Sequence, residues 1–136
     1  MHRAIKGATV LLAILATRVE AQKVKEPSFD GIPLSAWVAD LSAAAPYTRN
    51  KAAYAIGGMG PSAKAAVPAL IQVLNDQDAP PVVRYPVCVA LREIGPEAKE
   101  AVPALKAAMD DRNDDVAAMA RQALRAITGE EPRPTE

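Results

Sequence analysis

Cysteine and histidine are almost absent from this chain. Of 136 residues, only Cys88 is a cysteine and only His2 is a histidine. A single thiol excludes an intrachain disulfide, so the stability of the fold must come from packing alone. Catalytic pairs in which a histidine activates a serine or cysteine also need a histidine close to the nucleophile. We therefore expect a non-enzymatic protein with no catalytic residues, no bound metal and no cofactor.

Aromatic residues are scarce as well: one Trp, three Tyr and one Phe make up 4% of the chain. Hydrophobic residues nevertheless account for 50% of the sequence, and alanine supplies much of that share. Alanine has the highest helix propensity and a low strand propensity. No stretch shows the alternation of β-branched or aromatic residues with polar ones that is typical of a strand. The composition predicts an all-α fold.

No apolar run is long enough to cross a bilayer, which needs about 20 residues. The best candidate, Ala8–Ala16, follows a basic start at residues 2–6 and precedes small residues at Val19–Ala21. This order is typical of a signal peptide. We interpret residues 1–21 as a signal peptide, which predicts an exported, periplasmic or secreted protein without stable membrane insertion after cleavage. A membrane anchor or an ordinary buried helix is the alternative interpretation.

The charge balance is close to neutral. The chain has 16 basic and 16 acidic side chains, and cleavage after residue 21 would leave 13 basic and 15 acidic ones. A nucleic-acid-binding domain usually carries a basic balance and a basic face. We therefore expect no nucleic acid among the partners.

The clearest pattern is an internal repeat. The segment Gly60–Leu70 returns 35 residues later as Gly95–Leu105, and nine of the eleven positions are identical. A period in the mid-thirties indicates stacked pairs of helices, because one such unit cannot bury its apolar face alone. Pro68 and Pro103 hold equivalent places, and we expect each to begin a helix after a short helical turn.

Hydrophobic spacing predicts four further helices, over residues 33–44, 48–59, 81–94 and 114–127. Together with the helices that begin near Pro68 and Pro103, they would form three antiparallel pairs. Pro86 departs from this pattern, and we expect it to delay the start of its helix or to bend it. The domain organisation is then an extended lead-in at 22–32, a repeat domain at 33–128 and a disordered tail at 129–136. We interpret Trp37 as a cover for the open end of the stack, with ligand binding as the alternative.

Residues 49–59, 84–94 and 115–127, with the two Ala-Val-Pro-Ala-Leu segments, resemble HEAT repeats, in particular the short repeats named after phycobilisome lyases. The lead-in at 29–37 is similar to that of exported bacterial HEAT proteins. The resemblance implies an α-α superhelix, a short solenoid of about three helix pairs. It also implies a scaffold that mediates protein–protein interaction through the concave side lined by the second helices. The candidate partner-binding residues on those helices are Lys64, Gln72, Lys99, Glu100 and Lys106; an ordinary solvated face would carry the same charges.

Two features suggest other chemistry. Cys88 is the only thiol, so the alternative function, an accessory lyase or chromophore-handling protein, would depend on it. A buried and inert thiol is the other interpretation, because free cysteines are usually buried. The acidic run at 110–115 lacks the glycine and glutamate that a calcium loop requires, and we interpret it as a turn with Asn113 or Asp114 capping the next helix. The protein partner is not identified by the sequence, and self-association through the ends of the stack remains open.

Overall fold

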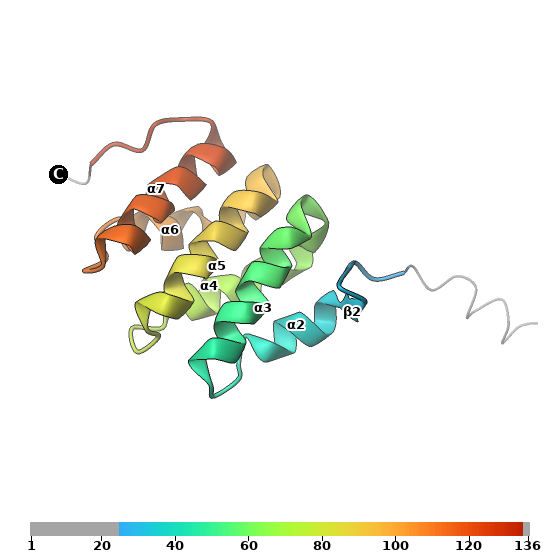
Figure 1. The fold of residues 1–136 in the computed structure, drawn as a ribbon. Coiled ribbons are helices and arrows are strands. Elements are labelled where there is room, and N and C mark those ends of the chain that lie inside the picture. Colours follow the sequence, from blue (N-terminus) through green and yellow to red (C-terminus); the bar gives the residue numbers. More distant parts are fainter. Residues whose placement is uncertain (1–24, 135–136) are drawn as a thin grey trace, which may run out of the picture.

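The protein is a short stack of helices in two layers. The computed structural model describes residues 25–134, and the expected signal peptide lies outside them. The α-helices are α2 (Leu34–Asp40), α3 (Pro46–Gly58), α4 (Val67–Asn75), α5 (Pro81–Ile94), α6 (Val102–Ala108) and α7 (Asp114–Thr128). In Figure 1 helices α3, α5 and α7 lie side by side, with α4 and α6 behind them. The all-α prediction and the six expected helices are confirmed.

The two copies of the repeat fold in the same way. Two 3₁₀ segments, η1 (Gly60–Ala66) and η2 (Gly95–Ala101), lead into α4 and α6. Gly60 and Gly95 have φ values of +59° and +71°, a region that favours glycine. Each is followed by a proline, and Pro68 and Pro103 then occupy the first turns of α4 and α6. The expected proline positions and the short turns before them are therefore confirmed.

Small residues set the close spacing of the front layer. Gly57 of α3 lies against Ala90 of α5, and a Cβ placed on Gly57 would come within 3.2 Å of the Ala90 Cα. Ala52, Ala53 and Ala90 are all fully buried. Because these side chains are short, the two backbones can pack closely and remove apolar surface from water without large residues.

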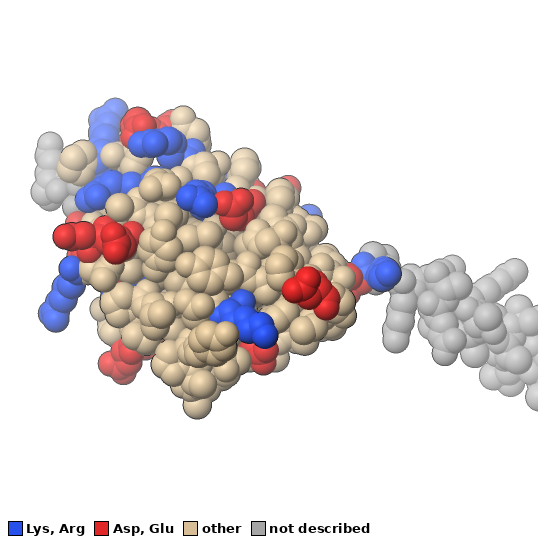
Figure 2. Space-filling model, viewed as in Figure 1, with Lys and Arg blue, Asp and Glu red and all other residues tan. Residues whose placement is uncertain are grey.

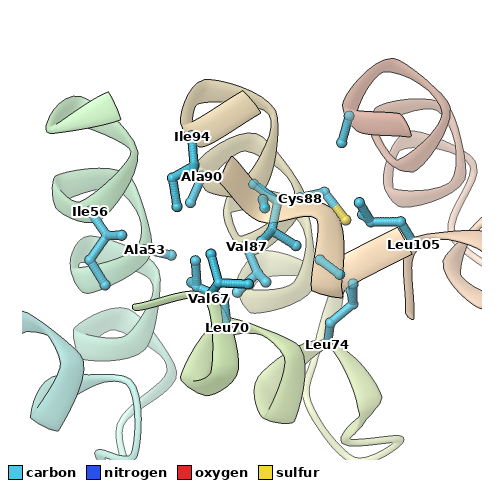
Figure 3. Close-up of a cluster of buried hydrophobic side chains, with 14 of the residues drawn as sticks. Ala53, Ile56, Val67, Leu70, Leu74, Val87, Cys88, Ala90, Ile94 and Leu105 are labelled. Atoms are coloured by element: carbon cyan, nitrogen blue, oxygen red, sulfur yellow. The ribbon is translucent and has the colours of Figure 1, made fainter. Parts of the chain in front are cut away.

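One continuous apolar core runs between the two layers, and Figure 3 shows its central part. The inward residues expected from the spacing of α5 and α7 are all buried: Val83, Val87, Ala90, Leu91, Ile94, Val116, Ala120, Ala123, Leu124 and Ile127. Those expected on α3 are buried too, except for Met59, which is partly exposed. Packing of these stripes supplies most of the stability, because an isolated helix of this length is marginal in water.

Pro86 lies inside α5 and does not delay its start. The helix begins at Pro81, where a proline costs nothing because the first N–H groups of a helix have no internal partner. The helix then continues through Pro86 to Ile94, and the Pro86 ring is fully buried. Of the two effects expected of Pro86, a delayed start or a bend, the structure contradicts the delayed start.

The first helix is shorter than expected. It ends at Asp40 rather than near residue 44, and α3 begins at Pro46, two residues earlier than expected. A proline disfavours helical angles in the residue before it, and Ala45 is accordingly extended, with φ −76° and ψ 122°. Residues 41–45 therefore form the turn that connects α2 to α3.

Within the segment expected to be an extended lead-in, a small hairpin forms. Strands β1 (Ser28–Phe29) and β2 (Ile32–Pro33) pair antiparallel, with Phe29 opposite Ile32. Asp30 and Gly31 connect them with φ values of +50° and +75°, as a two-residue hairpin turn requires. The Phe29 ring covers Gly58, where a Cβ would lie 2.5 Å from the ring. The hairpin thus packs on the end of α3.

The ends of the stack are closed by buried side chains. Trp37 is 4% exposed, which agrees with the interpretation that it covers one end. The Lys51 Nζ lies 5.9 Å from the centroid of the Trp37 ring. At the other end Met119 and Leu124 are 6% and 2% exposed. Residues 129–134, part of the expected disordered tail, have no helix or strand. Residues 130–134 line a cleft of about 410 Å³ with Leu124 and Met109. These terminal side chains are therefore not available for self-association through the ends.

Candidate interaction face

Two clefts lie one repeat apart on the side of the stack formed by α4 and α6, and we call this side the cleft face. The N-terminal cleft, of about 230 Å³, is lined by Leu41, Ser42, Ala43, Arg49, Ala69, Gln72, Val73 and Asp76. The C-terminal cleft, of about 390 Å³, is lined by Leu74, Asn75, Gln77, Arg84, Ala104, Ala107, Ala108, Asp110, Asp111 and Arg112. Each cleft combines alanine walls with one arginine from the front layer and an aspartate from the loop after a second helix.

An ion pair closes the base of the C-terminal cleft. Arg84 Nε donates to Asp111 Oδ2 at 2.8 Å, and Arg84 Nη2 donates to Asp111 Oδ1 at 2.9 Å. A third donor, Nη1, contacts the Ala79 carbonyl oxygen. The two side chains are only 15% and 11% exposed. The bidentate geometry holds the loop after α6 against the loop before α5.

The carboxylate of Asp111 is held in its charged form. Burial alone would raise its pKa, but hydrogen bonds from Arg84 and from the Asn113 N–H, together with the Arg84 charge, lower the pKa below its usual value. The Asn113 N–H donates to Asp111 Oδ1 at 2.9 Å. Asp111 therefore stays ionised at neutral pH and fixes the conformation of the turn.

The N-terminal cleft has the same residue types at its base without the same bonds. Arg49 and Asp76 stand 35 residues before Arg84 and Asp111. Asp76 Oδ1 accepts the Asp78 N–H at 2.9 Å, which repeats the turn at Asp111 and Asn113. Among residues 25–134, however, no ion pair joins Arg49 to Asp76, and the buried Arg49 Nε has no hydrogen-bond partner. Nε itself is enclosed, so a molecule bound in this cleft would meet the other N–H groups of the Arg49 side chain.

The residues nominated from the sequence are all exposed but do not form one site. Lys64, Lys99 and Glu100 lie on the 3₁₀ segments rather than on the second helices, because those helices begin only at Val67 and Val102. Gln72 lines the N-terminal cleft, and Lys106 lines the cleft beside the C-terminal segment. Only Gln72 thus lies at one of the two clefts of the cleft face.

The arginines and aspartates of the clefts were missed by sequence reasoning. A signal was present, since Arg49 and Arg84 share the 35-residue spacing of the repeat and so do Asp76 and Asp111. The aspartates were interpreted only as turn residues, and the arginines only as parts of their helices. That each arginine reaches the loop after a second helix depends on how neighbouring repeats stack, which the spacing alone does not give.

The acidic run forms a capped turn, as expected. Asn113 is the N-cap of α7, and its side-chain oxygen accepts the Val116 N–H at 3.1 Å. Asp114 and Asp115 lie in the first turn, where negative charge is favourable. In the described part of the chain, no three histidine, cysteine or acidic side chains are placed to hold a metal ion.

Cys88 is buried in the core between α5 and its neighbours (Figure 3). Burial is the main cause that raises the pKa of its thiol to about 12; Asp111 raises it further and Arg84 opposes the change. At neutral pH the group is thus a protonated thiol out of reach of solvent, whereas a nucleophile must be an accessible thiolate. The interpretation of Cys88 as buried agrees with the structure, and nothing in this geometry supports a role in lyase chemistry.

No helix in residues 25–134 is both long and apolar enough to cross a membrane.

The comparisons with known proteins agree with this fold. A family model described as HEAT repeats matches residues 34–125, which is more than half of the chain. No curated protein and no solved structure matches the chain. Stacked helix pairs, a 35-residue period and this match together show that the chain belongs to the HEAT-repeat family.

Proposed function

We propose that this protein is a non-enzymatic scaffold that binds a protein partner along its cleft face. HEAT repeats commonly serve as interaction scaffolds. The observation that carries the proposal is the Arg49 side chain, which lines the N-terminal cleft beside the exposed Gln72 and, among residues 25–134, forms no ion pair. A guanidinium group without an acidic partner of its own can pair with a carboxylate that a partner brings into the cleft.

The chemistry of Arg49 indicates what the partner presents there. Guanidinium groups bind carboxylates in a planar, often bidentate arrangement, as Arg84 binds Asp111 in the next repeat. We therefore propose that the partner inserts an acidic side chain beside Arg49. The alanine walls of both clefts allow its backbone to approach closely, so an extended segment fits better than a bulky helix.

We further propose that the interaction takes place in an exported compartment. The support comes from the sequence of residues 1–21, with a basic start, a short apolar run and small residues near position 21. The single cysteine is compatible with an oxidising environment, because a buried lone thiol cannot form a disulfide.

A site-specific cross-linking experiment tests the proposal. A photoreactive amino acid replaces Gln72, and the protein is irradiated in an extract of exported proteins from the source cells. We expect one discrete cross-linked product that is lost with Arg49→Met and kept with Arg125→Met, a control on the exposed side of α7. Circular dichroism confirms that each variant is folded. A product that forms equally well with Arg49→Met, or no product at all, contradicts the proposal.

A further inference from the structure

The side of the stack away from the clefts carries an unusual group of exposed residues. We call it the outer face; it consists of the outward sides of α3, α5 and α7, seen from the front in Figure 2. Tyr47, Tyr54 and Val82 are 76%, 46% and 54% exposed, and Tyr85 and Val89 are partly buried beside them. Uncharged side chains make up most of its centre (Figure 2).

The composition of the outer face is that of a protein interface. All three tyrosines of the chain lie on it. Tyrosine is enriched in the centres of protein–protein interfaces, whereas charged residues are depleted there. Tyr54, Val82 and Tyr85 line one shared depression together with Pro81 and Pro86, and Asn50, Asn113 and the acidic Asp115 line it as well. A contiguous group of this kind marks an interaction surface rather than scattered exposure.

The outer face has a projection and a hollow at opposite ends of one helix. Tyr47 projects at the first turn of α3. At the other end lies a shallow hollow of about 420 Å³, and Tyr54, Val89 and Glu93 are among the residues that line it. The half-exposed Phe29 ring lies over Gly58 at its edge. A surface with matching convex and concave parts on one helix is complementary to an inverted copy of itself.

We propose that the outer face binds a second copy of this chain in an antiparallel, twofold arrangement. In it each α3 lies across the α3 of the other copy, and Tyr47 enters the hollow beside Val89 and Glu93 of that copy, next to the Phe29 ring. A twofold interface uses the same patch on both subunits, so Tyr47 of each copy fills the hollow of the other copy at the same time. The twofold axis lies in the interface plane, perpendicular to the helices.

Charge at the edge of the outer face supports this orientation. Asp115 lies in the first turn of α7, and Arg125 lies in its last turns. Antiparallel packing places Asp115 of one copy near Arg125 of the other, on both sides of the axis. The present partner of Arg125 is Glu131, and both are more than half exposed, so that surface pair is weak and easily exchanged. The other twofold arrangement, with parallel helices, would bring Glu93 against Glu93.

The arrangement leaves the cleft face free. The clefts are lined from α4 and α6, which lie behind the front layer (Figure 1). A dimer through the outer face would therefore carry two cleft faces that point away from each other. This inference rests on the outer face alone and stands whether or not the cleft face binds the proposed partner.

Analytical ultracentrifugation of the purified chain over a concentration series tests the proposal. We expect a reversible dimer that becomes a monomer with Tyr54→Arg, because the buried charge would have no partner in the interface. The control Gln72→Arg changes an exposed residue of the cleft face and is expected to remain dimeric. A wild-type protein that is monomeric at every concentration overturns the proposal, and so does a dimer that Tyr54→Arg leaves intact.

Cysteine cross-linking tests the orientation. If Tyr47 lies opposite Gly58, the twofold axis passes the middle of α3 and the equivalent middle of α5. At a rise of about 1.5 Å per residue, Val89 is then about 2 Å along α5 from the axis and Val82 about 8 Å. We expect Val89→Cys to form a disulfide between copies under mild oxidation and Val82→Cys not to do so. The native Cys88 is buried and does not interfere. Cross-linking through Val82→Cys instead overturns the antiparallel arrangement.

Discussion

The side chain of Asn50 completes a hydrogen bond that Pro86 cannot make. Asn50 Nδ2 on α3 donates to the carbonyl oxygen of Val82 on α5 at 2.7 Å. In a regular helix this carbonyl would accept the N–H of residue 86, but proline has none. A neighbouring helix thus supplies the missing donor, which explains how α5 continues through a buried proline.

We expect Asn50→Asp to reduce the free energy of unfolding by about 1 kcal/mol, because a carboxylate cannot donate to the Val82 carbonyl. The cost should shrink in a Pro86→Ala background, where the new N–H of residue 86 can make the helical bond itself. A double-mutant cycle measured by urea denaturation checks this coupling. Additive effects of the two substitutions would mean that the Asn50 bond does not replace the helical one.

The pair Arg84–Asp111 should contribute more to stability than the equivalent pair one repeat earlier. Asp111→Asn removes the charge that faces a largely buried guanidinium group, and we expect a loss of about 2–3 kcal/mol in the free energy of unfolding. Asp76→Asn is the matched control, since Asp76 forms no ion pair with Arg49, and it should cost much less. Equal losses in thermal or chemical unfolding would contradict this prediction.

Acid should weaken the fold partly through Asp111. Its pKa is lowered in the folded protein, so below the ordinary aspartate value of about 4 the unfolded chain binds a proton that the folded chain does not. Stability is therefore present above that pH and is lost as the pH falls towards the lower, folded pKa. Asp111→Asn should flatten this dependence when unfolding is followed by circular dichroism between neutral and acidic pH.

Cys88 should resist thiol reagents until the protein unfolds. Because burial raises its pKa to about 12, the folded protein keeps the thiol proton above the ordinary cysteine pKa, whereas the unfolded chain loses it. Stability from this group is thus present at neutral pH and declines as the pH rises towards 12. Labelling with a maleimide should be slow in buffer and fast in denaturant, and Cys88→Ala should show a smaller decline at alkaline pH. Rapid labelling of the native protein would reopen a reactive role.

Substitutions at two glycines with positive φ can show the cost of backbone strain without any steric clash of the new side chain. Gly95 has φ +71° and ψ −140°, a region nearly restricted to glycine, whereas Gly129 has φ +75° and ψ 3°, which asparagine tolerates. A Cβ at either position would meet no atom within 4 Å. We expect Gly95→Asn to cost about 1–3 kcal/mol and Gly129→Asn to be nearly neutral. Similar melting temperatures for the two variants would contradict the assignment of strain.

Local signals in the sequence were enough to predict most of the fold. The bounds 81–94 of one helix, the two glycine-proline corners and the burial of Val87 and Leu91 follow from spacing and from the conformational limits of glycine and proline. The start of α3 and the hairpin were predicted wrongly, although they too depend on local turn signals. Pro46 begins α3, and Asp30-Gly31 is a hairpin turn, and both signals were present but were not used.

The sites were harder to predict because they depend on the stacking of repeats. The bond from Asn50 to Val82 and the ion pair from Arg84 to Asp111 join residues 32 and 27 positions apart. The residue types at these positions do not by themselves predict such long-range contacts. The outer face was missed for another reason: its tyrosines and valines are few, and only the three-dimensional arrangement of α3 and α5 brings them together.

The two glycine-proline corners have one more consequence. Ala66 and Ala101 have nearly the same angles (φ −81°, ψ −11° and φ −80°, ψ −7°), and Val67 and Val102 share φ −54° and ψ −47°. The segment Gly60–Ile94 therefore begins at one joint and ends where a closely similar joint starts. A tandem duplication of this segment would need no new type of turn. It would lengthen the array by one repeat and add one cleft, so the number of clefts can grow with copy number.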